Sequence, residues 1–179
     1  MNREDIKRFA LPFYNSSTRF FHNWSHIQDG LSYEHLMNNE QYIAWLFHDI
    51  IYLAGFSENE EASAKYLENY ILSNDLNVDH KIACQIILDT KNHKTDNYHS
   101  QIVQDIDMLC FSHDYNDFVL SRINIAKEYI PFYGEGKVNF GIIDFLKSIK
   151  NEKIYLTDDF KHLNDKAYCN IEQYIKEYQ

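Results

Sequence analysis

Histidine and aspartate side chains, residue types that commonly bind catalytic metals, lie at the edges of three apolar segments of the chain. These segments read FHNWSHI, AWLFHDIIY and VQDIDML. A polar group that is buried without a partner costs roughly 2–7 kcal/mol, so such groups need compensation. One divalent cation compensates several imidazoles and carboxylates at once, which predicts a buried metal site. The candidate residues are His22, His26, His48, Asp49, Asp105 and Asp107.

The spacing of these residues favours a catalytic metal over a structural one. His22 and His26 are four residues apart, so in a helix both would project from one face, about 5–6 Å apart. One of them could bind the ion while the other contacts the molecule that is bound to the ion. His48 and Asp49 are adjacent, and adjacent residues of a helix point in different directions. Both could bind one ion only if the ion lay across the helix rather than above it. Mixed imidazole and carboxylate ligands suit manganese, iron, zinc, cobalt or nickel better than calcium, and the set leaves coordination positions open.

The elements that must position these residues are expected to be helices. The chain has two prolines and five glycines in 179 residues, and its apolar residues recur at intervals of three and four. This pattern predicts an all-α fold, and the lack of a repeat or linker predicts one domain over residues 1–179. Ser57 and Glu60 have the spacing of a capping box, Gly55 is expected to close the third helix, and residues 131–136 are expected to form a loop. We expect helices over residues 3–14, 24–38, 40–53, 58–73, 78–91, 98–111, 114–130, 137–149 and 158–178.

The composition excludes several classes of protein. Lys and Arg number 17 against 27 Asp and Glu, a net charge of −10, and no basic stripe is visible, so duplex nucleic acid is not an expected partner. A membrane is not expected either, because no apolar run reaches about 18 residues. The first residues do not read as a signal peptide. The three cysteines lack metal-type spacing and indicate a reducing compartment, so we expect a cytoplasmic protein, either monomeric or a homodimer.

The order His, His-Asp, Asp on an all-α chain resembles the HD superfamily of metal-dependent phosphohydrolases. FHNWSHI is also similar to a motif of cyclic-nucleotide phosphodiesterases, which share the HD arrangement. The whole chain most resembles a small bacterial group of predicted HD phosphohydrolases, over about residues 10 to 150. The matching pieces are RFFH with HI at 26–27, FHDIIY, SENEEASA, ILDTKNH, DIDML and KEY at 127–129. The resemblance implies a compact HD-domain-like helical bundle with a buried metal site.

The resemblance also implies roles for individual residues. The expected metal ligands are His26, His48, Asp49 and Asp107. Members of the superfamily place the last ligand before a hydrophobic pair, which favours Asp107 and leaves Asp105 as the alternate. Two residues at this spacing cannot share a helix face, so one of them should face elsewhere. His22 corresponds to the histidine that protonates the leaving oxygen. Alternatively, His22 forms a hydrogen bond that supports the metal-binding residues. The cofactor is expected to be a divalent Mn, Mg, Co, Fe, Ni or Zn ion.

Four flanking residues are further candidates for the site. Arg19, three residues before His22, could clamp a phosphate oxygen or pair with one of the many acidic residues. Lys91 and His93 follow an apolar run together, so Lys91 could hold phosphate. His93 could bind a second metal ion, contact phosphate or lie on the surface. Glu60 could act at the site, as a ligand of a second metal ion, or merely cap its helix.

These expectations combine into hydrolysis of a phosphoester or phosphoanhydride in a small molecule, with a nucleotide favoured as substrate. The expected catalytic residues are His22, Asp49, Arg19 and Lys91. One alternative is a di-iron HD-type oxygenase, which needs further histidine ligands, and only His93 is well placed for that. Another alternative is a non-catalytic regulatory module that binds metal or nucleotide.

Overall fold

The computed structural model describes residues 2–179, and this part of the chain is all-helical, as predicted, with nine α-helices and no β-strand. Four short 3-10 turns, η1 to η4, join or extend the helices. The α-helices are α1 (Arg3–Ala10), α2 (Trp24–Leu31), α3 (Asn39–Phe47), α4 (Asn59–Ser73), α5 (His80–Thr90), α6 (Tyr98–Asp107), α7 (Tyr115–Tyr133), α8 (Glu135–Ile149) and α9 (Asn164–Tyr178).

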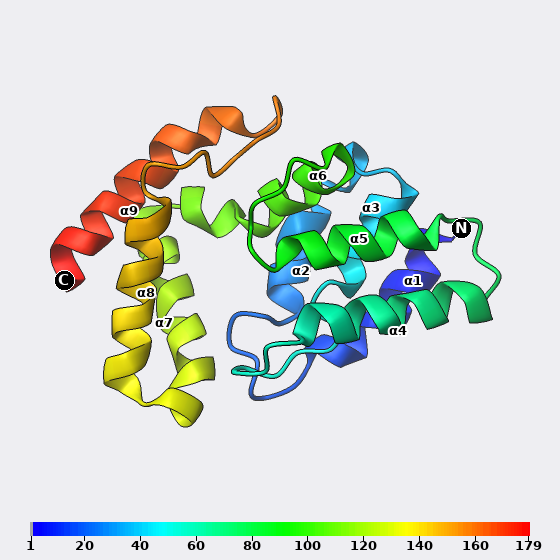
Figure 1. Ribbon diagram of the computed structural model, residues 1–179, viewed down its shortest axis with the longest axis horizontal. Coiled ribbons are helices and arrows are strands. Elements are labelled where there is room, and N and C mark those ends of the chain that lie inside the picture. The colour runs from blue at the N-terminus through cyan, green and yellow to red at the C-terminus, as the bar shows by residue number, and fades with distance from the viewer. Residues whose placement is uncertain (1) are drawn as a thin grey trace.

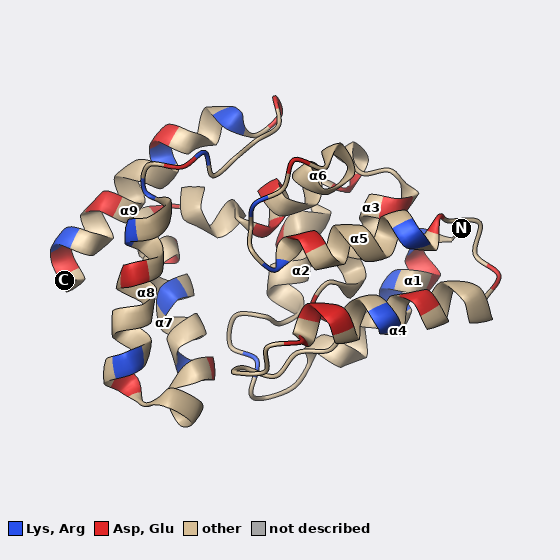
Figure 2. Cartoon of the chain, in the orientation of Figure 1, with Lys and Arg blue, Asp and Glu red and all other residues tan. Residues whose placement is uncertain are grey.

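The helices form two neighbouring groups along the long axis of the molecule. α1 to α6 lie together at the N-terminal end, and α7, α8 and α9 lie at the C-terminal end (Figure 1). α5 packs against α3, α4 and α6, and α7 packs against α8. Lys and Arg positions alternate with Asp and Glu positions along the ribbon of both groups (Figure 2).

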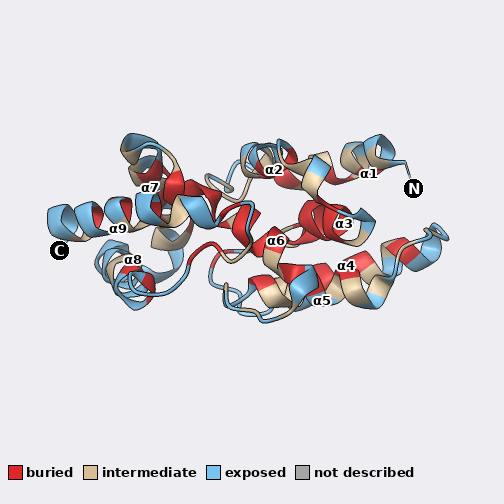
Figure 3. Ribbon diagram, turned by 90° about the horizontal axis from the view of Figure 1, so that it is seen from above, coloured by how far each residue is buried: buried red, intermediate tan, exposed pale blue. Residues whose placement is uncertain are grey.

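Helix α3 is the centre of the core. Every residue from Gln41 to Phe47 is buried, and α3 lies among the other helices of the N-terminal group (Figure 3). A helix that is apolar on all sides, as YIAWLF is, can only be stable when it is surrounded. Its start is defined by a capping box, in which the Asn38 side chain accepts the Gln41 N–H and the Gln41 side chain accepts the Asn38 N–H.

Several predicted helix ends are wrong. The helix expected over 40–53 ends at Phe47, because the backbone of Ile51 and Leu53 bonds instead to the side chains of Ser63 and Asn59. Gly55 therefore lies beyond the helix, in the following turn. The segment expected as helix over 24–38 ends at Leu31.

Three other local predictions also fail. The expected capping box of Ser57 and Glu60 is absent from the described chain, since α4 begins at Asn59 and its N-cap Glu58 makes no side-chain bond. The loop expected over 131–136 is mostly helical, because α7 continues to Tyr133 and only Gly134, with φ of 78°, turns the chain into α8. The last helix starts at Asn164 rather than at 158.

Gly30 allows α2 to approach α3 closely. A Cβ atom on Gly30 would lie 2.3 Å from Cζ2 of Trp45 and 2.6 Å from Cγ2 of Ile106. We expect Gly30→Ala to lower the free energy of unfolding by about 1–3 kcal/mol or more, because a packed core resists added volume. Denaturant unfolding measures this. The control is Gly136→Ala in α8, where a Cβ meets nothing within 4 Å, and equal stability of the two variants would contradict the packing described.

None of the helices in residues 2–179 is both long enough and apolar enough to cross a membrane.

Candidate metal centre

The candidate ligands come from the ends of three different helices. His26 lies in the first turn of α2, whose N-cap is Asn23. His48 is the C-cap of α3, and Asp49 follows it. Asp107 is the last residue of α6. Because these three helix ends meet, residues up to 81 positions apart come into contact.

These four side chains form one cluster. Nε2 of His26 lies 3.0 Å from Oδ1 of Asp107, and Nε2 of His48 lies 3.1 Å from Oδ2 of Asp49 and 3.6 Å from Oδ1 of Asp107. His26, His48 and Asp49 each offer a ligand atom within 4.8 Å of the others, close enough to hold one metal ion. Asp107 lies outside that mutually close triad but contacts both of its histidines.

The tautomer of His48 leaves its inner nitrogen without a proton when the ring is neutral. Nδ1 lies 2.8 Å from the carbonyl oxygen of Trp45, and a carbonyl only accepts, so Nδ1 must carry the hydrogen. The indole of Trp45 stacks on the imidazole with ring centroids 4.5 Å apart and so fixes its orientation. Nε2 is buried, has no hydrogen-bond partner among residues 2–179, and faces two carboxylates. A neutral His48 would therefore be repelled unless a cation lay between these groups.

The charges of the cluster attract positive charge. Burial opposes protonation of His48, but Asp49 and Asp107 outweigh it and raise the pKa of this imidazole well above its ordinary value. Burial would raise the pKa of Asp49 and of Asp107, but the neighbouring histidines hold both well below the ordinary range. Both carboxylates are therefore ionised near neutral pH, as metal ligands must be.

His93 lies on the other side of Asp107. Its Nδ1 is 3.5 Å from Oδ2 of Asp107 and is buried, with no hydrogen-bond partner in the described part of the chain. His93 has a positive φ of 47°, a conformation uncommon outside glycine, and its carbonyl accepts a hydrogen bond from the Gln104 side chain. The structure thus places His93 beside the cluster rather than on a remote surface.

Asp105 faces away from the cluster. It is fully buried, and its carboxylate accepts the N–H groups of Leu156 and Thr157 and the Thr157 hydroxyl at 2.5–2.8 Å. It anchors the segment before α9, whereas Asp107 faces the histidines.

We expect Asp105→Asn to separate fold stability from metal binding. The variant replaces an acceptor oxygen by an amide that cannot accept the Thr157 N–H, which should lower the free energy of unfolding by about 1–3 kcal/mol. Its metal affinity should stay close to that of the parent protein. Thermal unfolding and metal titration measure the two properties, and a large loss of affinity in this variant would contradict the assignment of Asp105.

His22 is held by Glu128, which the sequence analysis did not assign. His22 lies before α2, so it does not share a helical face with His26 as it would in a continuous helix. The two ring centroids are nevertheless only 6.3 Å apart. Nδ1 of His22 lies 2.5 Å from Oε2 of the buried Glu128 in α7. Glu128 also accepts the N–H groups of Phe21 and His22 and the hydroxyl of Tyr52.

The contacts of Glu128 favour a protonated His22. Burial lowers the pKa of His22, but Asp49 and Glu128 outweigh it and raise the value. Tyr52 stacks on the imidazole with centroids 4.2 Å apart, which limits its rotation. The only sequence signal for Glu128 was its place in the KEY segment at 127–129, and that segment had no assigned role.

The two cations expected to hold phosphate are already engaged. Arg19 donates to the carbonyl oxygens of His22, Asp49 and Ile50 at 2.7–3.2 Å, so it ties the loop before α2 to the chain after α3. Lys91 donates to Glu61 and to the carbonyl of Ser57, and Glu60 lies 3.5 Å from its Nζ. Both cations therefore have partners within the chain, Glu60 lies beside Lys91, and a role of either cation in holding phosphate stays a prediction.

No family model matches this chain, and neither a curated protein nor a solved structure matches it.

Proposed function

We propose that the protein is a divalent-metal-dependent phosphohydrolase of the HD type, which cleaves a phosphoester or phosphoanhydride of a small molecule such as a nucleotide. The observation that carries the proposal is His48, whose Nδ1 donates to the Trp45 carbonyl and whose Nε2 faces Asp49 and Asp107, where a divalent ion would displace its proton. Residues of this kind fit a divalent ion held by His26, His48, Asp49 and Asp107. The resemblance to HD phosphohydrolases seen in the sequence supports the same conclusion.

The side chains around the cluster supply the proton movements that hydrolysis needs. A bound divalent ion would lower the pKa of water and stabilise charge on a phosphoryl oxygen. Asp49, ionised at neutral pH, orients the attacking water and accepts the proton that the water loses as its oxygen bonds to phosphorus. As the new P–O bond forms and the old one breaks, His22 donates a proton to the leaving oxygen. Because Nδ1 of His22 is bonded to Glu128, Nε2 is the atom that delivers this proton.

We expect the purified protein to hydrolyse phosphoesters only when a divalent ion is present. The test is a screen of nucleotides and simple phosphoesters with Mn²⁺, Mg²⁺, Co²⁺ or Fe²⁺, with chelator as the control. At a hundredfold excess over the dissociation constant, the ion should stabilise the fold by about 2.7 kcal/mol, which raises the melting temperature by several degrees. Stabilisation without turnover on any substrate would favour a regulatory module. The absence of both stabilisation and turnover would refute the proposal.

His93 favours one competing function. Its Nδ1 near Oδ2 of Asp107 makes His93 a candidate ligand for a second ion, which a di-iron oxygenase would need. Two irons per chain together with oxygen consumption would support that function. Turnover of phosphoesters without oxygen consumption would support the hydrolase.

A further inference from the structure

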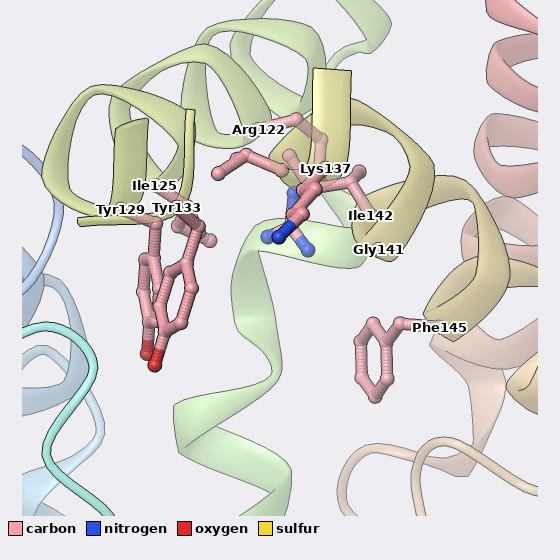
Figure 4. Close-up of a pocket in the computed structure, with 9 residues that line it drawn as sticks. Arg122, Ile125, Tyr129, Tyr133, Lys137, Gly141, Ile142 and Phe145 are labelled. Carbon is pink, nitrogen blue, oxygen red and sulfur yellow. The ribbon is translucent and has the colours of Figure 1, made fainter. Parts of the chain in front are cut away.

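A cavity of about 390 Å³ lies between α7 and α8, outside the cluster of metal-ligand candidates. Figure 4 shows Tyr129 and Tyr133 along one side of this cavity, Phe145 on the opposite side, and the nitrogen atoms of Arg122 and Lys137 between them. Its volume lies within the range of small-molecule sites, which usually combine apolar walls with a few polar groups.

Arg122 carries a buried charge without an acidic partner. The residue is only 4% exposed, and it donates to the Ser121 hydroxyl and to Sγ of Cys110. Its guanidinium carbon lies 4.5 Å from the ring centroid of Phe111. No carboxylate forms an ion pair with it among residues 2–179. Such a buried cation is normally paired with an anion, so an anion is the partner that this site lacks.

The rest of the cavity wall matches a flat anionic molecule. Lys137 adds a second positive charge, and the described residues that line the cavity include neither Asp nor Glu. Tyr129 and Tyr133 are stacked, with ring centroids 6.3 Å apart, so together they present a broad aromatic surface. Aromatic walls with nearby cations favour a planar ring that carries a negative group.

The cavity adjoins the candidate metal centre on two sides. The ring of Phe145 lies 6.5 Å from that of His93, which contacts Asp107. On the other side, Tyr129 follows Glu128, the residue that holds His22. The Tyr133 hydroxyl donates to the carbonyl of Gly55, in the turn that follows Asp49. A molecule in the cavity could therefore extend one end toward the cluster.

We propose that the cavity between α7 and α8 binds the non-reacting part of the substrate, a planar aromatic or heteroaromatic group bearing a negative charge that pairs with Arg122 and Lys137. This assignment rests on the proposed function, since it places the reacting phosphate at the neighbouring cluster. The substrate class is thus a phosphoester whose organic part is itself an aromatic anion.

The glycines of α8 provide a matched test of the cavity. Gly141 lies four residues from both Lys137 and Phe145, so the three share one helix face, and all of them line the cavity. A Cβ on Gly141 meets no atom within 4 Å, and the same holds for Gly136, which lies outside the cavity lining. Gly141→Leu should fill the cavity, whereas Gly136→Leu should leave it open, and both changes favour the helix.

The experiment uses chelator-treated protein and two naphthalene probes, 2-naphthoate and the neutral 2-naphthylmethanol, in calorimetric titrations. We expect 2-naphthoate to bind at least about tenfold more tightly, because hydrogen bonds to charged groups are worth more than neutral ones. Gly141→Leu should weaken binding of both probes about tenfold or more by occupying their space, and Gly136→Leu should change neither. Arg122→Met should remove the preference for 2-naphthoate.

Three results would overturn the proposal: no saturable binding to the parent protein, equal affinity for the two probes, or unchanged binding in Gly141→Leu. Because these titrations contain no metal and require no turnover, they are independent of the hydrolysis screen. Binding without any metal-dependent hydrolysis would refute the proposed function and leave an aromatic-anion site. Hydrolysis with no binding of either probe in the cavity would refute only the proposal that the cavity binds the substrate.

Discussion

Asp107→Asn is expected to abolish tight metal binding and to reduce metal-dependent phosphoester hydrolysis at least about a thousandfold, the scale on which a catalytic ion stabilises transition-state charge. One oxygen of Asp107 lies near Nε2 of His26 and His48, and the other lies near Nδ1 of His93. The asparagine keeps the shape of the side chain but removes its charge and one acceptor. Calorimetric metal titration and steady-state kinetics measure the two effects.

The matched control for this change is Asp105→Asn, on the same helix two residues earlier. It makes the same chemical change where the carboxylate holds Leu156 and Thr157 rather than the histidines. Circular dichroism should show that both variants remain helical. Equal losses of metal affinity in the two variants, or full activity in Asp107→Asn, would contradict the assigned geometry.

Glu128→Gln is expected to move the alkaline limit of hydrolysis to lower pH, so that the active pH range becomes narrower. As an acid, His22 is active only while it is protonated, so the rate falls as the pH rises through its pKa. Burial opposes the proton on His22, and Glu128 helps to retain it. Loss of that charge lowers the pKa, which moves the alkaline limb to lower pH. Above that limb the rate should drop by about a hundredfold, within the range of general-acid catalysis, and it should recover at lower pH.

The control for Glu128→Gln is Tyr52→Phe, which removes the hydroxyl donated to Glu128 but keeps the ring stacked on His22. This variant should leave the alkaline limb nearly in place. A uniform loss of rate at every pH in Glu128→Gln, with the limb unmoved, would mean that Glu128 only supports the fold. The pH dependence of kcat distinguishes these outcomes.

The helical class and the candidate residues His26, His48 and Asp49, which the fold brings together, could be predicted because they depend on local patterns. The run YIAWLF predicts a buried helix whatever surrounds it, and the two-residue spacing of Asp105 and Asp107 requires them to face different ways. The end of the YIAWLF helix, α3, was mispredicted because it depends on tertiary contacts. Ser63 and Asn59, both from α4, capture the backbone that would otherwise have continued the helix past Phe47.

The partners of the charged residues were beyond prediction for the same reason. Glu128 bonds to the backbone of Phe21 across 107 positions of sequence, and no spacing rule reaches that far. The sequence offered Lys91 as a phosphate-holding candidate but did not reveal that the fold places Glu61 within 2.7 Å of its Nζ. Arg19 resembled a phosphate clamp, yet its donors serve three backbone carbonyls that can be identified only from the folded chain.

The most direct test of the account is a calorimetric titration of chelator-treated protein with Mn²⁺, performed in buffers of different ionisation enthalpy. Without an ion, Asp49 and Asp107 keep a proton on His48 by raising its pKa, and binding must displace that proton. For a metal centre at this cluster we expect saturable binding, a heat of binding that varies with the buffer in the sense of proton release, and loss of this binding in Asp107→Asn. A flat titration, or binding that Asp107→Asn leaves unchanged, would contradict the claim that this cluster is a metal centre.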